Sequence, residues 1–289
     1  MHPVNIRWED KKVAPKTCSW LLGLGALLVF PQAAGSPSPL QLKGSFQQGG
    51  LVVGKTTPGT EVRFRGRPIR VSEEGAFLLG FGRDAPRKAR LTLISPEGTR
   101  DTANLPVEQR TYDTQRLDDL PEHKVTPMEE HLPRILLDQA MVQQARSLET
   151  PYPHFHADFR WPVHGPISSV YGSQRILNGK PRKPHTGVDI AAPAGTLVRA
   201  PAPGQVRLAE KGLFFSGGTL ILDHGHGLSS SYLHLGELLV EEGERVEQGD
   251  LIARVGASGR ATGAHLDWRI NLHGCSLDPA LVAAGSPTR

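Results

Sequence analysis

The chain has 289 residues, of which 32 are glycine and 24 are proline, and this abundance of helix-breaking residues argues against a coiled coil or a helix bundle. Hydrophobic residues make up 38% of the chain, which is too apolar for a wholly disordered polymer, and the length suggests about two domains. The formal net charge of +4 is divided between the first 35 residues and the remainder, so no dense cationic surface is left to bind nucleic acid.

Residues 1–35 have the pattern of a signal peptide. Three lysines between positions 11 and 16 precede an apolar run of 11 residues from Trp20 to Phe30, and small residues follow at 33–35. The run is too short for a membrane span, which needs about 20 residues. We therefore expect an exported protein that acts in the periplasm or cell envelope; a retained N-terminal anchor is the alternative.

Residues 36–122 predict a small β-sandwich that forms an accessory domain. Alternating stretches at Val62–Arg65 and Arg90–Leu93 are separated by turn signals such as Pro58-Gly59. The segment contains no histidine, and its acidic residues are scattered. We therefore expect a binding or shielding module, or a spacer, rather than a catalytic domain.

Residues 123–153 predict a helical linker. Thr126 and Glu129 form a capping box with Pro127 at the first helical position. Apolar residues at helical spacing then continue from Pro133 to about Glu149. We interpret this segment as a connecting helix rather than as a cofactor site.

Residues 154–289 predict a compact antiparallel β domain that carries the chemistry of the protein. Nine of the 12 histidines lie after residue 150. Apolar strands are predicted at 219–222, 238–240 and 251–255, between glycine-rich turns. The chain as a whole is therefore expected to be mainly β.

Two short motifs in this domain present polar side chains from an apolar background. His185 and Asp189 would be about 13 Å apart on a straight strand, but Gly187 allows the chain to bend so that the two side chains converge. His234 is the single imidazole in the apolar strand Ser231–Leu235. Each motif alone is a weak signal, because such spacings also occur by chance.

A third motif follows the glycine-rich loop at 256–263. In the predicted strand Ala264–Ile270, alternate residues share a face, so apolar side chains cover one side of the strand. The loop leads into a strand rather than a helix, which argues against a phosphate cradle. The polar face of this strand presents His265, Asp267 and Arg269.

In this order the motifs resemble those of the lysostaphin/LytM-type zinc endopeptidases of bacterial cell walls. The resemblance implies a compact antiparallel β peptidase domain with a groove for a peptide strand, and peptidoglycan stem peptides as the substrate. It covers roughly residues 160–282 and includes His185-x-x-x-Asp189, Ala200–Val206, Tyr232-x-His234-Leu235, Gly243–Gly249 and Gly263-x-His265-Leu266.

The resemblance also implies one Zn²⁺ per chain and a role for each motif residue. His185 and Asp189 are carried over as metal ligands, and His234 and His265 as the catalytic histidines that position water and stabilise the transition state. The third ligand in the family is a histidine, but this sequence has Asp267 there. Because carboxylate oxygen also binds zinc, the three residues remain a complete ligand set.

Asp267 changes the charge expected at such a centre. A dication with one carboxylate ligand keeps a single positive charge, whereas a dication with two carboxylates is neutral and acidifies water less. Metal preference and the level of activity therefore stay open. On this basis Asp267→His is expected to restore the usual ligand set, and His273 is a remote alternative as the third ligand.

The leading functional hypothesis is an exported zinc metalloendopeptidase that hydrolyses the peptide cross-links of peptidoglycan. The alternative is a catalytically weak or inactive peptidoglycan-binding or amidase-activating protein that retains the groove. A lipoyl or biotinyl carrier is nearly excluded, because no lysine occurs between Ser216 and Arg289. Proteins of the cell wall or the division machinery are further expected partners, and the oligomeric state is not predicted.

The remaining polar residues carry weaker expectations. His224 and His226 are interpreted as solvated turn residues, with a place beside the groove as the alternative. Cys275 is expected to be a semi-buried thiol, because no general base accompanies it. Arg175 and Asn178 lie in a loop that contacts either substrate or solvent. Exposed positions are expected for His154, His156 and His164.

Overall fold

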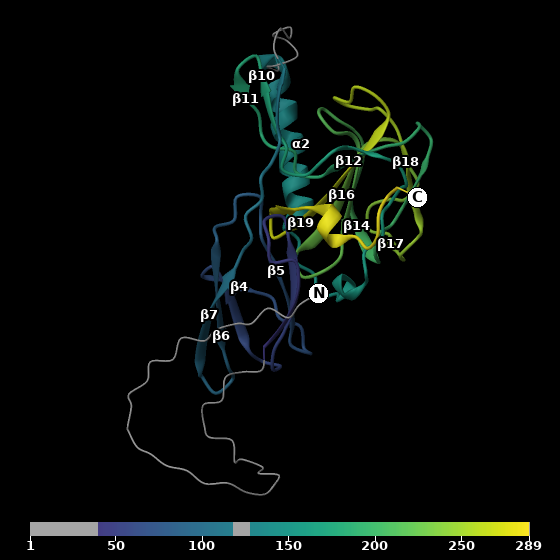
Figure 1. Ribbon diagram of the computed structural model, residues 1–289. Coiled ribbons are helices and arrows are strands. Elements are labelled where there is room, and N and C mark those ends of the chain that lie inside the picture. Colours follow the sequence, from purple (N-terminus) through teal and green to yellow (C-terminus); the bar gives the residue numbers. More distant parts are fainter. Residues whose placement is uncertain (1–39, 118–127, 289) are drawn as a thin grey trace, which may run out of the picture.

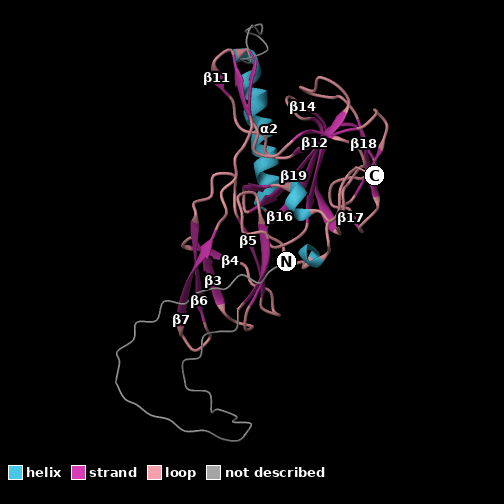
Figure 2. Ribbon diagram, in the orientation of Figure 1, coloured by secondary structure: helices cyan, strands magenta, loops and turns pink. Residues whose placement is uncertain are grey.

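The computed structural model describes residues 40–117 and 128–288 (Figure 1). The predicted signal peptide and the predicted capping box at Thr126 and Pro127 lie outside the described residues. Strands dominate both halves of the molecule, and one long helix, which connects them in the sequence, lies beside the C-terminal half (Figure 2). The prediction of a mainly β chain is therefore confirmed. Within the two described ranges, no helix has the length and apolar character needed to cross a membrane.

The N-terminal half is a β-sandwich of two antiparallel sheets. Its apolar core includes Val52, Phe77 and Leu91, which are 0–1% exposed and come from both sheets. One sheet has the order β1-β2-β5 and the other has the order β4-β3-β6-β7. Their bounds are β1 Gln41–Gly44, β2 Leu51–Lys55, β3 Glu61–Phe64, β4 Arg67–Ile69, β5 Ala76–Gly80, β6 Lys88–Ile94 and β7 Arg100–Pro106.

A linker helix, α2 (Leu132–Ser147), follows the 3₁₀ turn η1 (Glu129–His131). The helix ends two residues before the predicted Glu149, because Leu148 adopts an extended conformation ahead of Pro151. Ala145 packs in a small apolar cluster with residues of the C-terminal domain. The linker therefore lies against the C-terminal domain rather than standing free in solvent.

The C-terminal half is built on one ten-stranded sheet with the main order β17-β14-β15-β16-β19-β12-β9. Strand β16 pairs with β15 and β19, and its far end pairs with β18, so it joins two parts of the sheet. The elements are η2 His154–His156, β9 Ile167–Ser169, β12 Val188–Ala191, β13 Leu197–Arg199, β14 Gly204–Leu213, β15 Gly217–Asp223, β16 Leu228–Leu238, β17 Arg245–Val246, β18 Leu251–Val255, β19 His265–Leu272, β20 Cys275–Leu277 and α3 Pro279–Val282.

The predicted strands of this half agree with the structure except at one end. The stretches 219–222 and 251–255 fall within β15 and β18. The predicted strand at 238–240 is wrong beyond Leu238, where β16 ends. Leu239 and Val240 instead run into the turn that precedes β17, and Leu239 donates a backbone hydrogen bond to Ile252.

The two halves are joined by a shared core and by polar contacts. Ala76 and Leu78 of β5 belong to the same apolar cluster as Trp268 and Leu277 of the C-terminal half. Arg110 donates to the Asp278 carboxylate at 2.7 Å. A small sheet also spans the junction, formed by β8 Thr114–Leu117, β10 Gln174–Leu177 and β11 Lys180–Pro181.

Candidate metal centre

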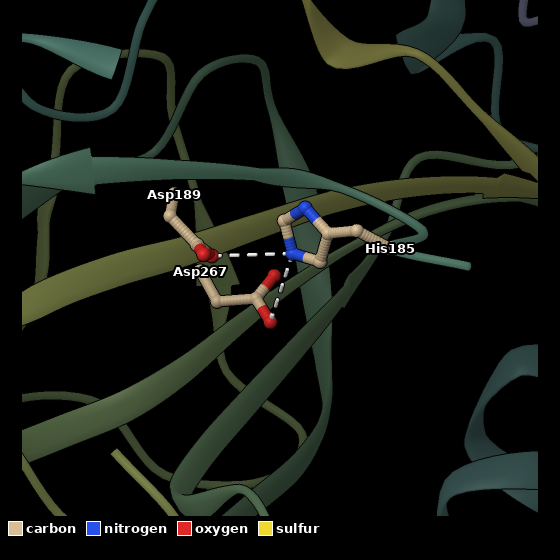
Figure 3. Close-up of side chains that lie close together, drawn as sticks. All are labelled: His185, Asp189 and Asp267. Carbon is tan, nitrogen blue, oxygen red and sulfur yellow. Dashed lines mark ion pairs between the residues drawn. The ribbon is translucent and has the colours of Figure 1, made fainter. Parts of the chain in front are cut away.

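Three potential metal-ligating side chains converge on the sheet of the C-terminal half. One ligand atom from each of His185, Asp189 and Asp267 lies within 4.8 Å of the other two (Figure 3). His185 Nε2 is 3.2 Å from Asp189 Oδ1 and 3.6 Å from Asp267 Oδ2. The structure thus brings together the three residues predicted as ligands.

Strand register explains why the two carboxylates meet. Strands β12 and β19 are antiparallel neighbours, and Asp189 is paired directly with Asp267. Directly opposed residues point to the same face of a sheet with their Cβ atoms about 5 Å apart. His185 lies in the loop just before β12 and reaches back over this pair (Figure 3).

The polar atoms at this point fit a metal ion. His185 Nε2 and Asp189 Oδ1 are buried, and neither has a hydrogen-bond partner among the described residues. Ligand atoms placed tetrahedrally at zinc distances of about 2.0–2.2 Å are about 3.3–3.6 Å apart. The two measured separations to His185 Nε2, 3.2 and 3.6 Å, lie close to this range. Two buried, opposed carboxylates also repel each other unless a cation lies between them.

The surroundings of His185 leave its Nε2 free to act as a ligand. Its Nδ1 faces the Val170 carbonyl and the Ser169 hydroxyl, each at 3.4 Å. The carbonyl favours a proton on Nδ1, so Nε2 is the nitrogen that faces the carboxylates. Burial lowers the pKa of His185, but the two carboxylates outweigh this effect and raise the pKa to about 9, so a metal that binds Nε2 at neutral pH must displace a proton from it.

Asp267 forms an ion pair with Arg269, two residues further along the same strand. Arg269 Nε lies 2.9 Å from Asp267 Oδ1 and 3.1 Å from Oδ2, and a second guanidinium nitrogen also donates to Oδ2. Burial raises the pKa of the Asp267 carboxyl, but Arg269 and then His185 outweigh burial and hold this pKa far below its usual value. Asp267 is therefore a carboxylate rather than a neutral acid.

The two predicted catalytic histidines lie beside His185, Asp189 and Asp267, which are called the ligand group from here on. The rings of His234 and His265 have centroids 4.8 Å apart, and His265 Nε2 is 3.9 Å from Asp189 Oδ1. His234 Nδ1 lies 2.9 Å from the Ser258 carbonyl, and His265 Nδ1 lies 2.9 Å from the Gly263 carbonyl. Both carbonyls can only accept, so each Nδ1 carries the proton and each Nε2 is left with a lone pair in the neutral ring.

A β-bulge sets the position of His234. The register between β15 and β16 slips by one residue where Gly218 pairs with Leu235 and Leu220 pairs with Tyr232. His234 lies in this irregular step with a φ of 64°, a left-handed conformation that costs energy for a residue with a Cβ. Burial also lowers the pKa of His234, which keeps the ring neutral at neutral pH.

Some of the weaker expectations are wrong. His224 and His226 are 0% and 2% exposed rather than solvated, because the turn that holds them is covered by the segment before η2. The ring of His226, for example, packs on Phe155. His273 pairs with Glu149 at 3.3 Å and is not part of the ligand group.

The remaining expectations agree with the structure in part. Cys275 is partly buried, and burial raises the pKa of its thiol. The loop expected at Arg175 is wrong, because Arg175 lies in strand β10, whereas Asn178 lies in the turn after that strand. Of the three histidines expected to be exposed, His156 and His164 are exposed, whereas His154 is half-buried.

One residue near the centre is not indicated by any sequence motif. Arg146, at the end of α2, donates to the Ser231 hydroxyl at 3.0 Å, and Ser231 pairs with Arg269 in the β16–β19 register. The linker helix thus places a second guanidinium close to the Asp267–Arg269 pair. A cavity of about 300 Å³ also opens beside His185, between the two halves of the chain, and is lined in part by Arg65, Tyr171 and Cys275.

The C-terminal half is similar in sequence to known peptidases. Residues 183–279 match the model of peptidase family M23. The DD-carboxypeptidase/endopeptidase Mpg of Neisseria meningitidis serogroup B is 38% identical over 126 residues, which is 43% of this chain and 29% of that protein. The peptidoglycan DD-endopeptidase ShyC of Vibrio cholerae serotype O1 is 33% identical over 144 residues, which is 48% of this chain and 31% of that protein.

A solved structure extends the similarity beyond the matched domain. A Pseudomonas aeruginosa protein named as a candidate peptidase M23 is 29% identical and aligns with a TM-score of 0.63 over 82% of this chain and 95% of its own. The chain spans only about three-tenths of the length of the two curated relatives, so their similarity is confined to part of each protein.

Proposed function

Because residues 183–279 form a peptidase family M23 domain, we propose that this protein is an exported zinc metalloendopeptidase that hydrolyses peptide cross-links of peptidoglycan. The family match confirms the resemblance inferred from the motifs. The observation that carries the proposal is the convergence of His185, Asp189 and Asp267, with two buried ligand atoms that lack hydrogen-bond partners within residues 40–117 and 128–288.

His185, Asp189 and Asp267 would hold the metal, and three protein ligands leave a position open for water or substrate. Zinc, when bound there, supplies a Lewis acid that polarises a carbonyl and acidifies water at neutral pH. The ligand residues themselves hold their geometry through their partners. Val170 and Ser169 orient the His185 ring, and Arg269 orients the Asp267 carboxylate.

In this proposal His234 and His265 carry out the proton transfers of the reaction. With Nδ1 committed to a backbone carbonyl, each neutral ring offers Nε2 as a proton acceptor for the attacking water. Once protonated, the same nitrogen becomes a donor that can stabilise the oxyanion or protonate the leaving amine. Addition of water across the peptide bond then gives a carboxylic acid and an amine, with no other reactant.

The proposed substrate is the peptide part of peptidoglycan. Support comes from the names of the curated relatives, which are a DD-carboxypeptidase/endopeptidase and a peptidoglycan DD-endopeptidase. Export follows from the same proposal, because this substrate lies outside the cytoplasm and residues 1–35 have the pattern of a signal peptide.

Digestion of purified peptidoglycan sacculi by the full chain tests this function. The metal content of the purified protein is measured first, and the soluble products are then identified by mass spectrometry. Release of uncross-linked stem peptides that stops with a chelator and resumes with Zn²⁺ supports the proposal. A zinc-loaded protein that binds sacculi but releases no peptide would favour the alternative of a binding or amidase-activating protein.

A further inference from the structure

We propose that Arg269 is a positioning residue of the metal centre, and that Asp267 and Arg269 act as one unit that takes the place of a neutral third ligand. This inference rests on the proposed metal centre and goes beyond it, because Arg269 is not itself a ligand. The starting observation is that guanidinium nitrogens of Arg269 contact both oxygens of Asp267, at 2.9 Å and 3.1 Å from Nε.

The first consequence concerns charge. A dication held by Asp189 and Asp267 has no net charge, and a neutral centre is a weaker Lewis acid. Asp267 is only 4% exposed, so water does little to screen its interaction with Arg269. With the guanidinium included, the group regains a single positive charge, as it would have with a neutral imidazole in place of Asp267.

The second consequence concerns orientation. Asp267 Oδ2 lies 3.6 Å from His185 Nε2 and also accepts a hydrogen bond from Arg269. Contacts from the guanidinium to both oxygens fix the plane of the carboxylate, which a single contact would leave free to rotate. Arg269 therefore holds one oxygen of Asp267 toward the other two ligands.

The fold makes room for this arrangement at Gly187. A Cβ at position 187 would lie 2.5 Å from Arg269 Cγ and 3.0 Å from Asp267 Oδ1. It would also lie 2.4 Å from the Trp268 carbonyl oxygen, so the backbone itself approaches closely. The glycine between the two ligands of the His185-x-x-x-Asp189 motif thus leaves the space through which the Arg269 side chain passes.

Arg146 lies close to the Asp267–Arg269 pair. It comes from α2, donates to Ser231 on β16, and lies near enough to Arg269 and Asp267 for their charges to affect it. Repulsion from this second cation favours the orientation in which the Arg269 guanidinium contacts the Asp267 carboxylate. The arrangement thus links the linker helix to the third ligand.

The proposal revises the expectation that Asp267→His alone restores the usual ligand set. In that variant Arg269 loses its carboxylate and remains as a partly buried cation beside the proposed ligands, which is unfavourable. The double variant D267H/R269Q removes both charges together. The two positions should therefore be strongly coupled, whereas independent contributions would add.

Zinc affinity of the full-length protein, measured by competition with a chromophoric chelator, tests the coupling. We expect Arg269→Gln to lose about tenfold, as partners of metal ligands usually do, and Asp267→His to lose about a hundredfold. The double variant D267H/R269Q should recover to within about tenfold of the wild type. Co²⁺ in place of Zn²⁺ should give a tetrahedral absorption spectrum in the wild type and the double variant, and an altered spectrum in D267H.

A matched control is Arg254→Gln, which removes an exposed ion pair with Glu237 and should leave zinc affinity unchanged. If Asp267→His does not fold, the zinc affinities of R269Q and of the double variant test the proposal, because both variants lack the Arg269 cation. A double variant that binds zinc at least as tightly as R269Q supports the proposal. The proposal would be overturned if the double variant binds zinc more weakly than both single variants, or if D267H binds zinc with wild-type affinity.

The outcomes separate this inference from the proposed function. If the wild-type protein hydrolyses sacculi, and the losses of zinc affinity in the two single variants add in the double variant, the inference alone is rejected. The predicted coupling in a protein that releases no peptide rejects the proposed hydrolysis and leaves the inference intact.

Discussion

Asp189 and Asp267 lie directly opposite each other on neighbouring antiparallel strands, with their side chains on one face of the sheet. Both carboxylates are largely buried, with side chains 14% and 4% exposed. Two like charges at such positions destabilise a sheet unless cations compensate for them. In this protein the compensation comes from Arg269 on one side and from His185, with its raised pKa, on the other. These cations therefore stabilise the pairing of the two carboxylates, and the same position is well suited to a dication.

Replacement of His185 and of His234 should separate metal binding from catalysis. His185→Ala removes a coordinating nitrogen, and we expect zinc affinity to fall by at least about a hundredfold. His234→Ala should leave zinc affinity within a few-fold of the wild type, because its ring contacts Ser258 and His265 rather than the ligand atoms. It should lower kcat by about 10²–10³-fold. Metal analysis and sacculus digestion measure the two effects, and equal zinc loss in both variants would contradict the assignment.

Gly187→Ala should damage both stability and metal binding. The added Cβ would meet the Trp268 carbonyl at 2.4 Å, and the backbone must shift to accommodate it. Overpacking of this kind typically costs about 1–3 kcal/mol of unfolding free energy. Because the same atom pushes against Arg269, zinc affinity should fall as well. Urea denaturation and chelator competition measure the two effects.

Gly212→Ala is the matched control for this prediction. Gly212 lies in β14, and a Cβ there would meet no atom of the described part of the chain within 4 Å. This variant should keep wild-type zinc affinity and stability. Equal behaviour of the two alanine variants would show that the space at Gly187 is not needed.

The ligand roles of His185, Asp189 and Asp267 were predicted from the family resemblance, whereas local patterns predicted only which side chains lie close together. Alternation along Ala264–Ile270 placed Asp267 and Arg269 on one face, and a bend at Gly187 was expected to bring His185 toward Asp189. The ion pair between Asp267 and Arg269 could have been inferred from the same alternation, because residues i and i+2 of a strand are neighbours on one face.

Contacts between distant segments could not be predicted in this way. Arg146 meets Ser231 across 85 positions of the chain, so its place near the centre depends on how α2 packs on the sheet. In the sequence His224 belongs to a polar turn, yet in the structure it is fully buried and hydrogen-bonded to Pro203 and Ser230. Turn composition describes local backbone preference and carries no information about which other segment covers the turn.

The junction between the two halves should depend on Asp278. Its carboxylate accepts from Arg110 at 2.7 Å and from the Ala280 backbone at 3.0 Å, where it caps α3. Asp278→Ala removes the cap and leaves Arg110 without its carboxylate, and we expect a loss of about 2 kcal/mol in unfolding free energy. Asp278→Asn keeps an oxygen for the cap and should lose less. Denaturant unfolding compares Asp278→Ala with Asp278→Asn, and equal losses of unfolding free energy would argue against a role for the charge of Asp278.

Stability should fall on acidification through a buried histidine far from the metal ligands. The Pro203 carbonyl can only accept, so His224 donates from Nδ1 at 2.7 Å and its Nε2 accepts from the Ser230 hydroxyl at 2.8 Å. Ser230 Oγ in turn can accept from the Tyr232 hydroxyl at 2.8 Å. Protonation of Nε2 would turn it into a donor, so the Ser230 and Tyr232 hydroxyls would have to reorient, and a charge would be buried. Burial accordingly lowers the pKa of His224 to about 4.

The pH dependence follows from the difference between the folded and unfolded proteins. An unfolded histidine has a pKa of about 6.5, so between about pH 6.5 and 4 the unfolded chain binds a proton that folded His224 does not. Stability contributed by His224 is therefore present above pH 6.5 and is lost as the pH falls toward 4, by up to about 3 kcal/mol. His224→Asn retains an amide donor for Pro203 and does not titrate, so its stability should fall less steeply over this interval. Urea denaturation compares the unfolding free energies of the wild type and His224→Asn, with excess chelator to remove the contribution of metal binding. Parallel pH profiles of these free energies would contradict the prediction.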